Sequence, residues 1–343
     1  MLSKRWPQSP AACNTFARRL LAAGRLACLA SLVCLFAAPA AFAQDWPSKP
    51  IRVVIPFAAG SVAEPIFRAM ATSVEARLKQ PFVLDNRAGA DGNIGTAAVV
   101  RAAPDGYTLL MAPTANYSIV QHMFRDLGFD PITALEPISL LAEAPVLVVV
   151  GTEVPARSLK ELADFLRANP RKYNYGSPGV GTPAFLVGTL FSQQTGNSMV
   201  YIPYKGTSPM VTALLAGDIQ VAFPSLPAVS SQLKAGRIRA LVVLARQRLG
   251  EIPDVPTTVE AGFPQLAITN WWVLAAPSGT SVRIIDRLAS EFRESLGDPE
   301  VKKRIAQLGH FTVGMSPAET AAHIRSESQR YKAILDSSGI KPE

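Results

Sequence analysis

Cysteine is absent from the chain after residue 34. The three cysteines, Cys13, Cys28 and Cys34, all lie within the first 43 residues. If that segment is removed during export, residues 44–343 contain no thiol. The composition therefore excludes disulfides, cysteine-ligated metal sites and cysteine nucleophiles from the mature protein.

The first 43 residues have the pattern of a secretory signal peptide. Five basic residues and no acid precede an apolar run over 26–40, and Ala41-Phe42-Ala43 then forms an A-x-A cleavage site. The run is too short for a stable transmembrane helix. No Leu-small-small triplet precedes Cys28 or Cys34, so we expect no lipid anchor. These features predict a protein that is cleaved and released into the periplasm.

Long apolar runs and a strong charge of one sign are also missing. Five of the 34 Lys and Arg residues leave with the first segment, so 29 remain against 26 Asp and Glu, a net charge of +3. Without a Lys/Arg run we expect no nucleic-acid partner. The longest later apolar stretch, 145–150, has the length of a buried strand, so we expect no direct membrane insertion. We expect a monomer.

Histidine is too scarce to support a clear catalytic or metal site. The mature chain has only His122, His310 and His323, without an H-x3-H pair or a carboxylate–His cluster. Ser177 is not in a G-x-S-x-G elbow, so a Ser–His enzyme would require His122 to reach it. We expect His310 and His323 to be solvated. No catalytic residue, metal or cofactor is predicted.

Glycine spacing does not indicate a nucleotide cofactor. Gly89, Gly92 and Gly95 are spaced as G-x-x-G-x-x-G rather than G-x-G-x-x-G, and no Walker sequence occurs. The glycines are better explained by a turn that leads into a helix.

Short β-branched runs alternate with segments of helical periodicity, which predicts an α/β fold. The expected strands are 51–55, 81–85, 107–111, 146–150, 173–176, 199–202, 219–223, 240–244 and 271–276. The expected helices are 65–79, 96–102, 158–169, 183–194, 208–216, 227–234, 282–296 and two that begin at 298 and 316.

Two of these strands are predicted to cross between two lobes. Taking 146–150 and 271–276 as the crossing segments gives a first lobe of residues 44–145 plus 271–343. The second lobe then comprises residues 146–270. Each lobe is expected to be a mixed sheet flanked by helices, with a ligand cleft between the lobes.

Two segments share the order strand, Gly/Ser-rich turn and helix start: 55–64 and 174–183. Glycine permits close backbone approach, and the N–H groups of a first helical turn have no intrahelical partner. Such N–H groups form an anion site, to which Ser61, Ser177 and Thr182 would add hydroxyl donors. Facing each other across a cleft, the two loops would fit a small carboxylate. The alternative is that both are ordinary β-to-α connections.

Aromatic residues also lie near the predicted cleft. Phe57 follows the first strand, and Trp271-Trp272 begins a later one. Core packing is the simpler interpretation of the two tryptophans. Tyr204, which follows another strand, would place a hydroxyl near the cleft.

The mature chain resembles the Bug-type extracytoplasmic solute receptors, the periplasmic receptors of tripartite tricarboxylate transporters, in the order of its motifs. These include IRVVIPFAAG, NRAGADGNIG, APDGYTLLMAP, NYGSPGVGTP, YIPYKGTSP, LLAGDIQVAF and PDVPTTVEAG. The resemblance implies a two-lobed, type II-like periplasmic binding protein (a Venus flytrap). Such a receptor is not an enzyme; it closes on a small carboxylate and delivers it to membrane permease subunits. It also implies that the loop 113–116 lines the cleft.

The pattern of loops and the resemblance together define a set of expected ligand-binding residues. These are Phe57, Ala59, Gly60, Ser61, Glu64, Thr114, Asn116, Ser177, Gly179, Gly181, Thr182, Tyr204 and Ser225.

The chain departs from the family pattern in ways that bear on the ligand. Ser61 and Glu64 replace a glycine and an aspartate of the first loop, and Pro224-Ser225 follows Phe223 where an acid or amide is usual. An amino-acid ligand needs a counter-charge for its ammonium group, so we expect a carboxylate without one. Two alternatives remain. One is an exported hydrolase or isomerase acting on a carboxylated substrate through Ser177 or Glu64, and the other is a carboxylate sensor subunit for a signalling kinase.

Overall fold

The structure is a computed structural model that describes residues 46–179, 182–245 and 247–338. The predicted signal peptide and Gly181 therefore lie outside the described residues. All elements below belong to one compact unit that begins at Pro47.

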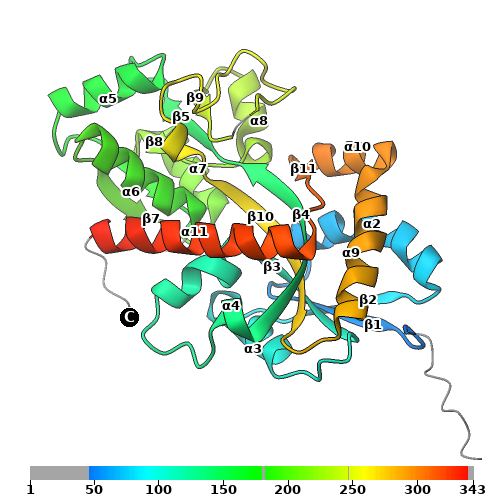
Figure 1. Cartoon of the computed structure of the whole chain (residues 1–343). Coiled ribbons are helices and arrows are strands. Elements are labelled where there is room, and N and C mark those ends of the chain that lie inside the picture. The colour runs from blue at the N-terminus through cyan, green and yellow to red at the C-terminus, as the bar shows by residue number, and fades with distance from the viewer. Residues whose placement is uncertain (1–45, 180–181, 246, 339–343) are drawn as a thin grey trace, which may run out of the picture. The chain divides into compact units, whose positions relative to one another are not determined.

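The first sheet is mixed and has the strand order β11-β4-β10-β3-β1-β2 (Figure 1). Parallel pairing joins β1 to both β2 and β3, whereas β10 runs antiparallel to β3 and β4. Its strands are β1 Ile51–Ile55, β2 Phe82–Asn86, β3 Thr108–Pro113, β4 Leu135–Pro145, β10 Thr269–Pro277 and β11 Phe311–Thr312.

The second sheet is also mixed and has the order β7-β6-β8-β5-β9. Here β6 pairs in parallel with β7 and β8, and β5 runs antiparallel to β8 and β9. Its strands are β5 Leu147–Gly151, β6 Asn174–Ser177, β7 Val200–Pro203, β8 Val221–Ala222 and β9 Ile238–Val243. Helices flank both sheets, so the α/β prediction is confirmed.

The helices begin where the sequence offers capping residues. Ser158 accepts a hydrogen bond from the Glu161 N–H while the Glu161 carboxylate accepts one from the Arg157 N–H, which starts α5. The α-helices are α2 Ala63–Leu78, α3 Asn93–Val100, α4 Pro131–Ala134, α5 Leu159–Ala168, α6 Pro183–Thr195, α7 Thr207–Ala216, α8 Leu226–Lys234, α9 Val282–Gly297, α10 Pro299–Gln307 and α11 Pro317–Ser338. Shorter helical turns are η1 Ala90–Gly92, η2 Ala115–Ile119, η3 Val120–His122 and η4 Pro264–Leu266.

Strand β4 was not predicted from the sequence. It is buried along almost its whole length, so its sequence LEPISLLAEAP lacks the alternation that marks a half-exposed strand. Pro137 also makes it look interrupted. In the sheet, Pro137 pairs with Ala275 beside a register shift in β10, a position where a strand tolerates proline.

Alternation along β5 shows how the second sheet is covered on both faces. Val148 and Val150 share one core with Leu162 of α5, whereas Leu147 and Val149 pack with Met210 of α7. Successive residues of a strand point to opposite faces, so one strand contributes to two cores. This is why its sequence is a continuous apolar run.

Helix α11 packs against both sheets (Figure 1). Ile324 belongs to the core of the first sheet, whereas Tyr331 and Ile334 pack in a core of the second. Arg330 donates hydrogen bonds to the carbonyls of Ala267 and Gln265, in the segment that returns to β10. The helix therefore connects the two sheets by side-chain packing and by hydrogen bonds.

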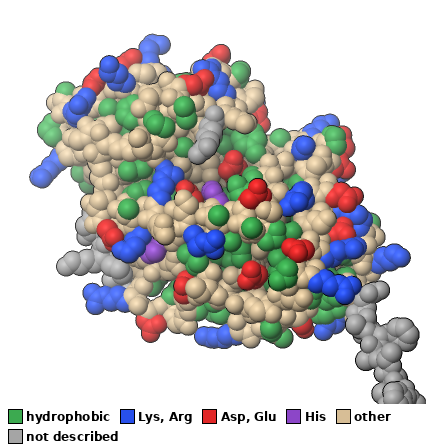
Figure 2. All heavy atoms as spheres, viewed as in Figure 1, with side chains coloured by type: hydrophobic (Ala, Val, Ile, Leu, Met, Phe, Trp, Pro, Cys, Tyr) green, Lys and Arg blue, Asp and Glu red, His purple; other side chains and the backbone are tan. Residues whose placement is uncertain are grey.

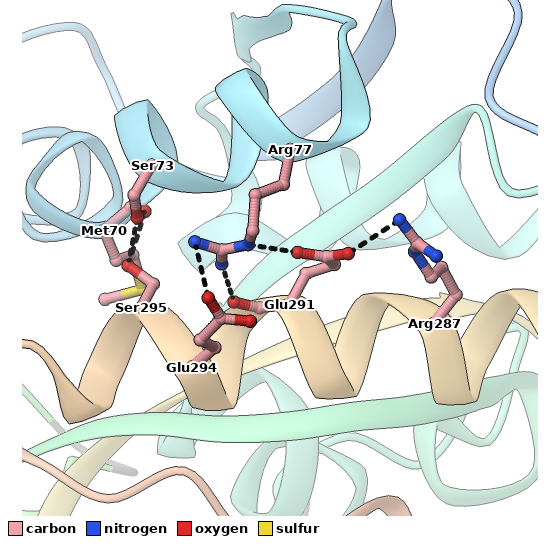
Figure 3. A network of polar contacts seen from close by, with 7 residues as sticks. All are labelled: Met70, Ser73, Arg77, Arg287, Glu291, Glu294 and Ser295. Atoms are coloured by element: carbon pink, nitrogen blue, oxygen red, sulfur yellow. Dashed lines mark hydrogen bonds and ion pairs between the residues drawn. The ribbon is translucent and has the colours of Figure 1, made fainter.

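Polar contacts hold α9 on α2 over one face of the first sheet (Figure 3). Arg77 binds the carboxylate and the carbonyl of Glu291, and Arg287 pairs with the same carboxylate at 2.9 Å. Ser295 donates to the Met70 carbonyl at 2.8 Å. On the face seen in Figure 2, acidic and basic side chains are interspersed over the surface.

Candidate functional site

A cavity of about 510 Å³ lies where strand-to-helix connections from both sheets meet. From the first sheet, β1 is followed by Phe57, β2 by Asp91 and β3 by Ala115 and Asn116. These are the carboxyl ends of its parallel strands, the edge at which α/β sheets bind ligands.

The second sheet contributes the corresponding edge. The connection after β6 supplies Gly179 and Thr182, that after β7 supplies Thr207, and that after β8 supplies Pro224 and Ser225. Because β6, β7 and β8 are parallel, their carboxyl ends lie at one edge and all three connections open on the cavity.

Three helices begin at the cavity from this second side. Thr182 is the N-cap of α6, Thr207 is the first residue of α7, and Ser225 is the N-cap of α8. The N–H groups of a first helical turn have no intrahelical acceptor and lie at the positive end of the helix dipole. The described lining residues include no Lys, Arg or His. The positive potential at this wall therefore comes from the helix dipoles and from the first-turn N–H groups beside Pro183, Pro209 and Pro227, which have none.

The opposite part of the cavity is apolar. Phe57 and Trp272 meet edge to face, with ring centroids 6.0 Å apart. Both line the cavity, together with Val120, Met123 and Phe124. This wall offers contact area for carbon rather than hydrogen bonds.

The neighbouring tryptophans face opposite sides of β10. Trp271 is fully buried in the core of the first sheet, whereas Trp272 lines the cavity. The Trp272 indole donates from Nε1 to His310 Nε2 at 3.2 Å, and His310 Nδ1–H donates to the Leu308 carbonyl at 2.8 Å. Burial lowers the pKa of His310, which keeps the ring neutral and Nε2 available as an acceptor.

Asp91 is the one charged side chain among the described residues that line the cavity. Its backbone carbonyl accepts a hydrogen bond from Asn116 Nδ2 at 2.7 Å. This bond sets the orientation of the Asn116 amide and leaves Oδ1 buried without a partner. The first-sheet side therefore presents the Asp91 carboxylate, whereas the Asn116 amide oxygen is a buried acceptor.

Five of the expected ligand-binding residues line the cavity: Phe57, Asn116, Gly179, Thr182 and Ser225. Seven others are described but are not among the lining residues: Ala59, Gly60, Ser61, Glu64, Thr114, Ser177 and Tyr204. Several of the second group hold the lining residues in place.

Glu64 and Ser177 do not line the cavity, but each forms hydrogen bonds within one of the two loops. Glu64 Oε1 accepts from the Gly60 N–H and from Asn86 Nδ2, each at 2.9 Å, which closes the turn after β1. Ser177 Oγ donates to the Gly179 carbonyl at 2.8 Å and lies 3.0 Å from the Tyr201 hydroxyl. Thr114 Oγ1 accepts from the Trp271 N–H at 2.8 Å and so joins the loop after β3 to β10.

The histidines are not placed for catalysis with Ser177. His122 Nε2 bonds to Ser328 Oγ at 2.8 Å, while the polar partners of Ser177 are Gly179 and Tyr201. The expectation that His310 and His323 are solvated is wrong. His310 is 6% exposed, and His323 packs on Trp271 with Nε2 buried, because both fill space beside β10.

No cluster of three His, Cys, Asp or Glu side chains in the described ranges could hold a metal ion. Among the same residues, no helix combines the length and apolar character needed to cross a membrane.

Sequence reasoning missed several lining residues. Asp91 and Thr207 each follow a parallel strand, and that position alone would have suggested them. Met123 and Phe124 follow η3, where no motif marks them.

The comparisons with known proteins agree with this arrangement. The model of the tripartite tricarboxylate transporter family receptor matches residues 66–340. BugT of Bordetella pertussis is 32% identical over 300 residues, covering 87% of this chain and 92% of BugT. The match spans most of both proteins.

Two solved structures share the fold over nearly their full length. R. palustris Rpa4515 with adipate is 31% identical with a TM-score of 0.75, covering 87% of this chain and 100% of that one. The periplasmic binding protein BugD is 29% identical with a TM-score of 0.71, covering 87% and 100%. The expected two-lobed periplasmic binding protein fold is thus confirmed, as is the resemblance to Bug receptors. The chain belongs to the tripartite tricarboxylate transporter receptor family, a family of periplasmic solute-binding receptors.

Proposed function

We propose that the protein captures a small carboxylate between two lobes and presents it to the membrane permease subunits of a tripartite transporter. In this proposal, residues 1–43 are removed on export. The lobes comprise residues 44–145 plus 271–343 and residues 146–270. The supporting observation is the convergence of three helix N-termini on one cavity, from α6, α7 and α8.

Several donors are needed for useful affinity. One helix N-terminus stabilises an exposed anion by only about 0.3–1 kcal/mol. Three of them facing one cavity, with the hydroxyl groups of Thr207 and Ser225, multiply the contacts to a single carboxylate. The Thr182 hydroxyl already donates to the Gly179 carbonyl. Closure around the ligand would exclude water and strengthen each of these interactions.

The absence of an acid beside these donors supports a ligand without an α-ammonium group. Phe223, Pro224 and Ser225 line the second-sheet side of the cavity and carry no charge. The acid that does line the cavity, Asp91, comes from the first sheet. An α-amino acid with its carboxylate at the helix starts would find no acid for its ammonium group on the second-sheet side of the cavity.

The environments of Ser177 and Glu64 favour binding over chemical conversion. The Ser177 hydroxyl is buried and bonded to Gly179 and Tyr201, and within the described ranges no histidine or carboxylate is among its partners. The Glu64 carboxylate is occupied by Gly60 and Asn86. Ser177 therefore lacks a base to activate it as a nucleophile. Glu64 is not among the described residues that line the cavity.

Thermal unfolding with a panel of carboxylates and amino acids tests the proposal. At a hundredfold excess over Kd, a ligand stabilises the folded state by about 2.7 kcal/mol. We expect such a shift with carboxylates that lack ammonium, and unchanged ligand after prolonged incubation. A shift with α-amino acids alone, or conversion of the ligand, would contradict the proposal.

Co-purification distinguishes delivery from signalling. We expect the ligand-loaded protein to retain the permease subunits after these are solubilised from membranes. Retention of a sensor kinase instead would make the protein a signalling subunit.

A further inference from the structure

We propose that the bound acid has an apolar carbon skeleton, a chain or a ring, that packs against Phe57 and Trp272. Its carboxylate would lie at the starts of α6, α7 and α8. This inference rests on the proposed function and specifies the class of ligand for the same cavity.

The cavity divides into a donor side and an apolar side. Backbone N–H groups of three helix starts define the first. Phe57, Trp272, Val120, Met123 and Phe124 define the second, whose described polar lining residues are Asp91, Asn116 and Asn270. A carboxylate with a hydrocarbon body satisfies both sides at once, because each group meets a partner of its own polarity.

The aromatic wall is held in one orientation. Trp272 is only 3% exposed, and its indole Nε1 is hydrogen-bonded to His310. His310 is in turn fixed by the Leu308 carbonyl. We therefore assign His310 as a positioning residue, which keeps the Trp272 ring beside Phe57 rather than free to turn. A wall that is already ordered loses little side-chain entropy when a ligand packs on it.

The same wall disfavours acids with many hydroxyl or carboxylate groups. A hydroxyl that leaves water for an apolar surface loses hydrogen bonds without replacement. Tartrate would bring two hydroxyl groups to this side, where Asn116 and Asn270 are the described lining residues with an amide acceptor, and citrate would bring three carboxylates. Asp91 adds like-charge repulsion toward further carboxylates on that side.

A ladder of straight-chain acids tests the inference by calorimetric titration of the purified mature protein. Burying one methylene group contributes about a fourfold gain in affinity. We expect affinity to rise about fifteenfold from succinate to adipate, or from butyrate to hexanoate. We also expect tartrate to bind at least tenfold more weakly than succinate. An affinity that stays constant or falls with chain length in both series, or tighter binding of tartrate or citrate than of succinate, would overturn the inference.

Variants of the wall give the second measurement. Trp272→Ala should reduce the gain per methylene to less than twofold, while the affinity for the shortest acid of the series changes less than threefold. Val282→Ala, at a site 73% exposed, serves as the matched control and should leave the ladder unchanged. If Trp272→Ala does not fold, Phe57→Ala removes the other ring of the wall from a loop. An unaltered ladder in a folded wall variant would place the ligand's body elsewhere.

Different results would reject the proposed function and the inference about the ligand's skeleton. If no carboxylate of any class produces heat or a thermal shift, the proposed function itself is wrong. If carboxylates bind but hydroxylated acids are preferred, the function stands and only the apolar skeleton is rejected.

Discussion

The indole of Trp272 donates a hydrogen bond to His310 across 3.2 Å, joining the cavity wall to the segment that leads into β11. The imidazole uses its other nitrogen on the Leu308 carbonyl. A neutral ring is required, since a protonated His310 would place an N–H against the indole N–H. Burial maintains that state by lowering the pKa of His310.

Stability should fall as the pH drops below about 6.5. Burial lowers the pKa values of His122, His310 and His323, so below about 6.5 the unfolded chain binds protons that the folded protein does not. The melting temperature should decrease between about pH 7.5 and pH 5.5. His310→Gln keeps an acceptor for Trp272 and should flatten this dependence, and an identical pH profile in the variant would count against the assignment.

Gly179→Val should weaken carboxylate binding more than Gly60→Val. Both glycines have positive φ, of 153° and 83°, so valine strains either loop even though an added Cβ meets open space or only Thr182 at 3.9 Å. Only Gly179 lines the cavity. We expect Gly60→Val to lower stability by about 1–3 kcal/mol with a smaller change in Kd. Equal effects of the two variants on Kd would show that the first loop also contacts the ligand.

Ser177→Ala should loosen the second loop without abolishing folding. It removes the hydrogen bonds to Gly179 and Tyr201, at a cost of about 1–2 kcal/mol in the free energy of unfolding. The affinity for carboxylate should fall severalfold because Gly179 is held less firmly. Tyr201→Phe, which removes one of these bonds and keeps the ring, should show a smaller change in both urea unfolding and titration. A catalytic Ser177 would instead show loss of turnover at unchanged affinity.

Asp91→Asn should raise the affinity for carboxylates a fewfold, and more for dicarboxylates than for monocarboxylates. The change removes the negative side chain from the lining, so its effect should diminish as salt is added. Asp254→Asn alters an exposed acid outside the lining and serves as the control. Weaker binding in Asp91→Asn would mean that Asp91 holds a donor group of the ligand.

Arg77→Ala should destabilise the protein by about 2 kcal/mol without changing ligand affinity. The variant leaves the buried Glu291 carboxylate with Arg287 alone and frees the Glu291 carbonyl (Figure 3). Arg287→Ala breaks a pair whose basic partner is largely exposed and should cost less than about 1 kcal/mol. Equal losses in the free energy of unfolding for Arg77→Ala and Arg287→Ala, measured by urea denaturation, would contradict this ranking.

Local sequence rules accounted for much of the secondary structure. The capping residues Ser158 and Asp298 begin α5 and α10 as expected, because their side chains satisfy N–H groups only a few residues away. Strand β4 was missed, since a strand that is buried on both faces has no alternation to detect. Its pairing with β10 joins residues that are more than a hundred positions apart.

For the cavity, sequence reasoning located the loops better than the side chains. Phe57 of loop 55–64 lines the cavity, and so does Gly179 of loop 174–183. Which member of a turn faces the cavity depends on backbone geometry. Ser177, for example, turns its hydroxyl toward the Gly179 carbonyl rather than toward the cavity.

By itself the sequence determined the alternation of strands and helices, the glycine-rich turns and the family, because these depend on neighbouring residues and on motif order. Only the tertiary structure decided which wall of the cavity is apolar. Trp272 faces the cavity while Trp271 is buried in the core, and His310 reaches the indole from a distant segment. The physical reason is that the strand pairing of β10 sets which face each tryptophan occupies, and that pairing is formed by residues far apart in the chain.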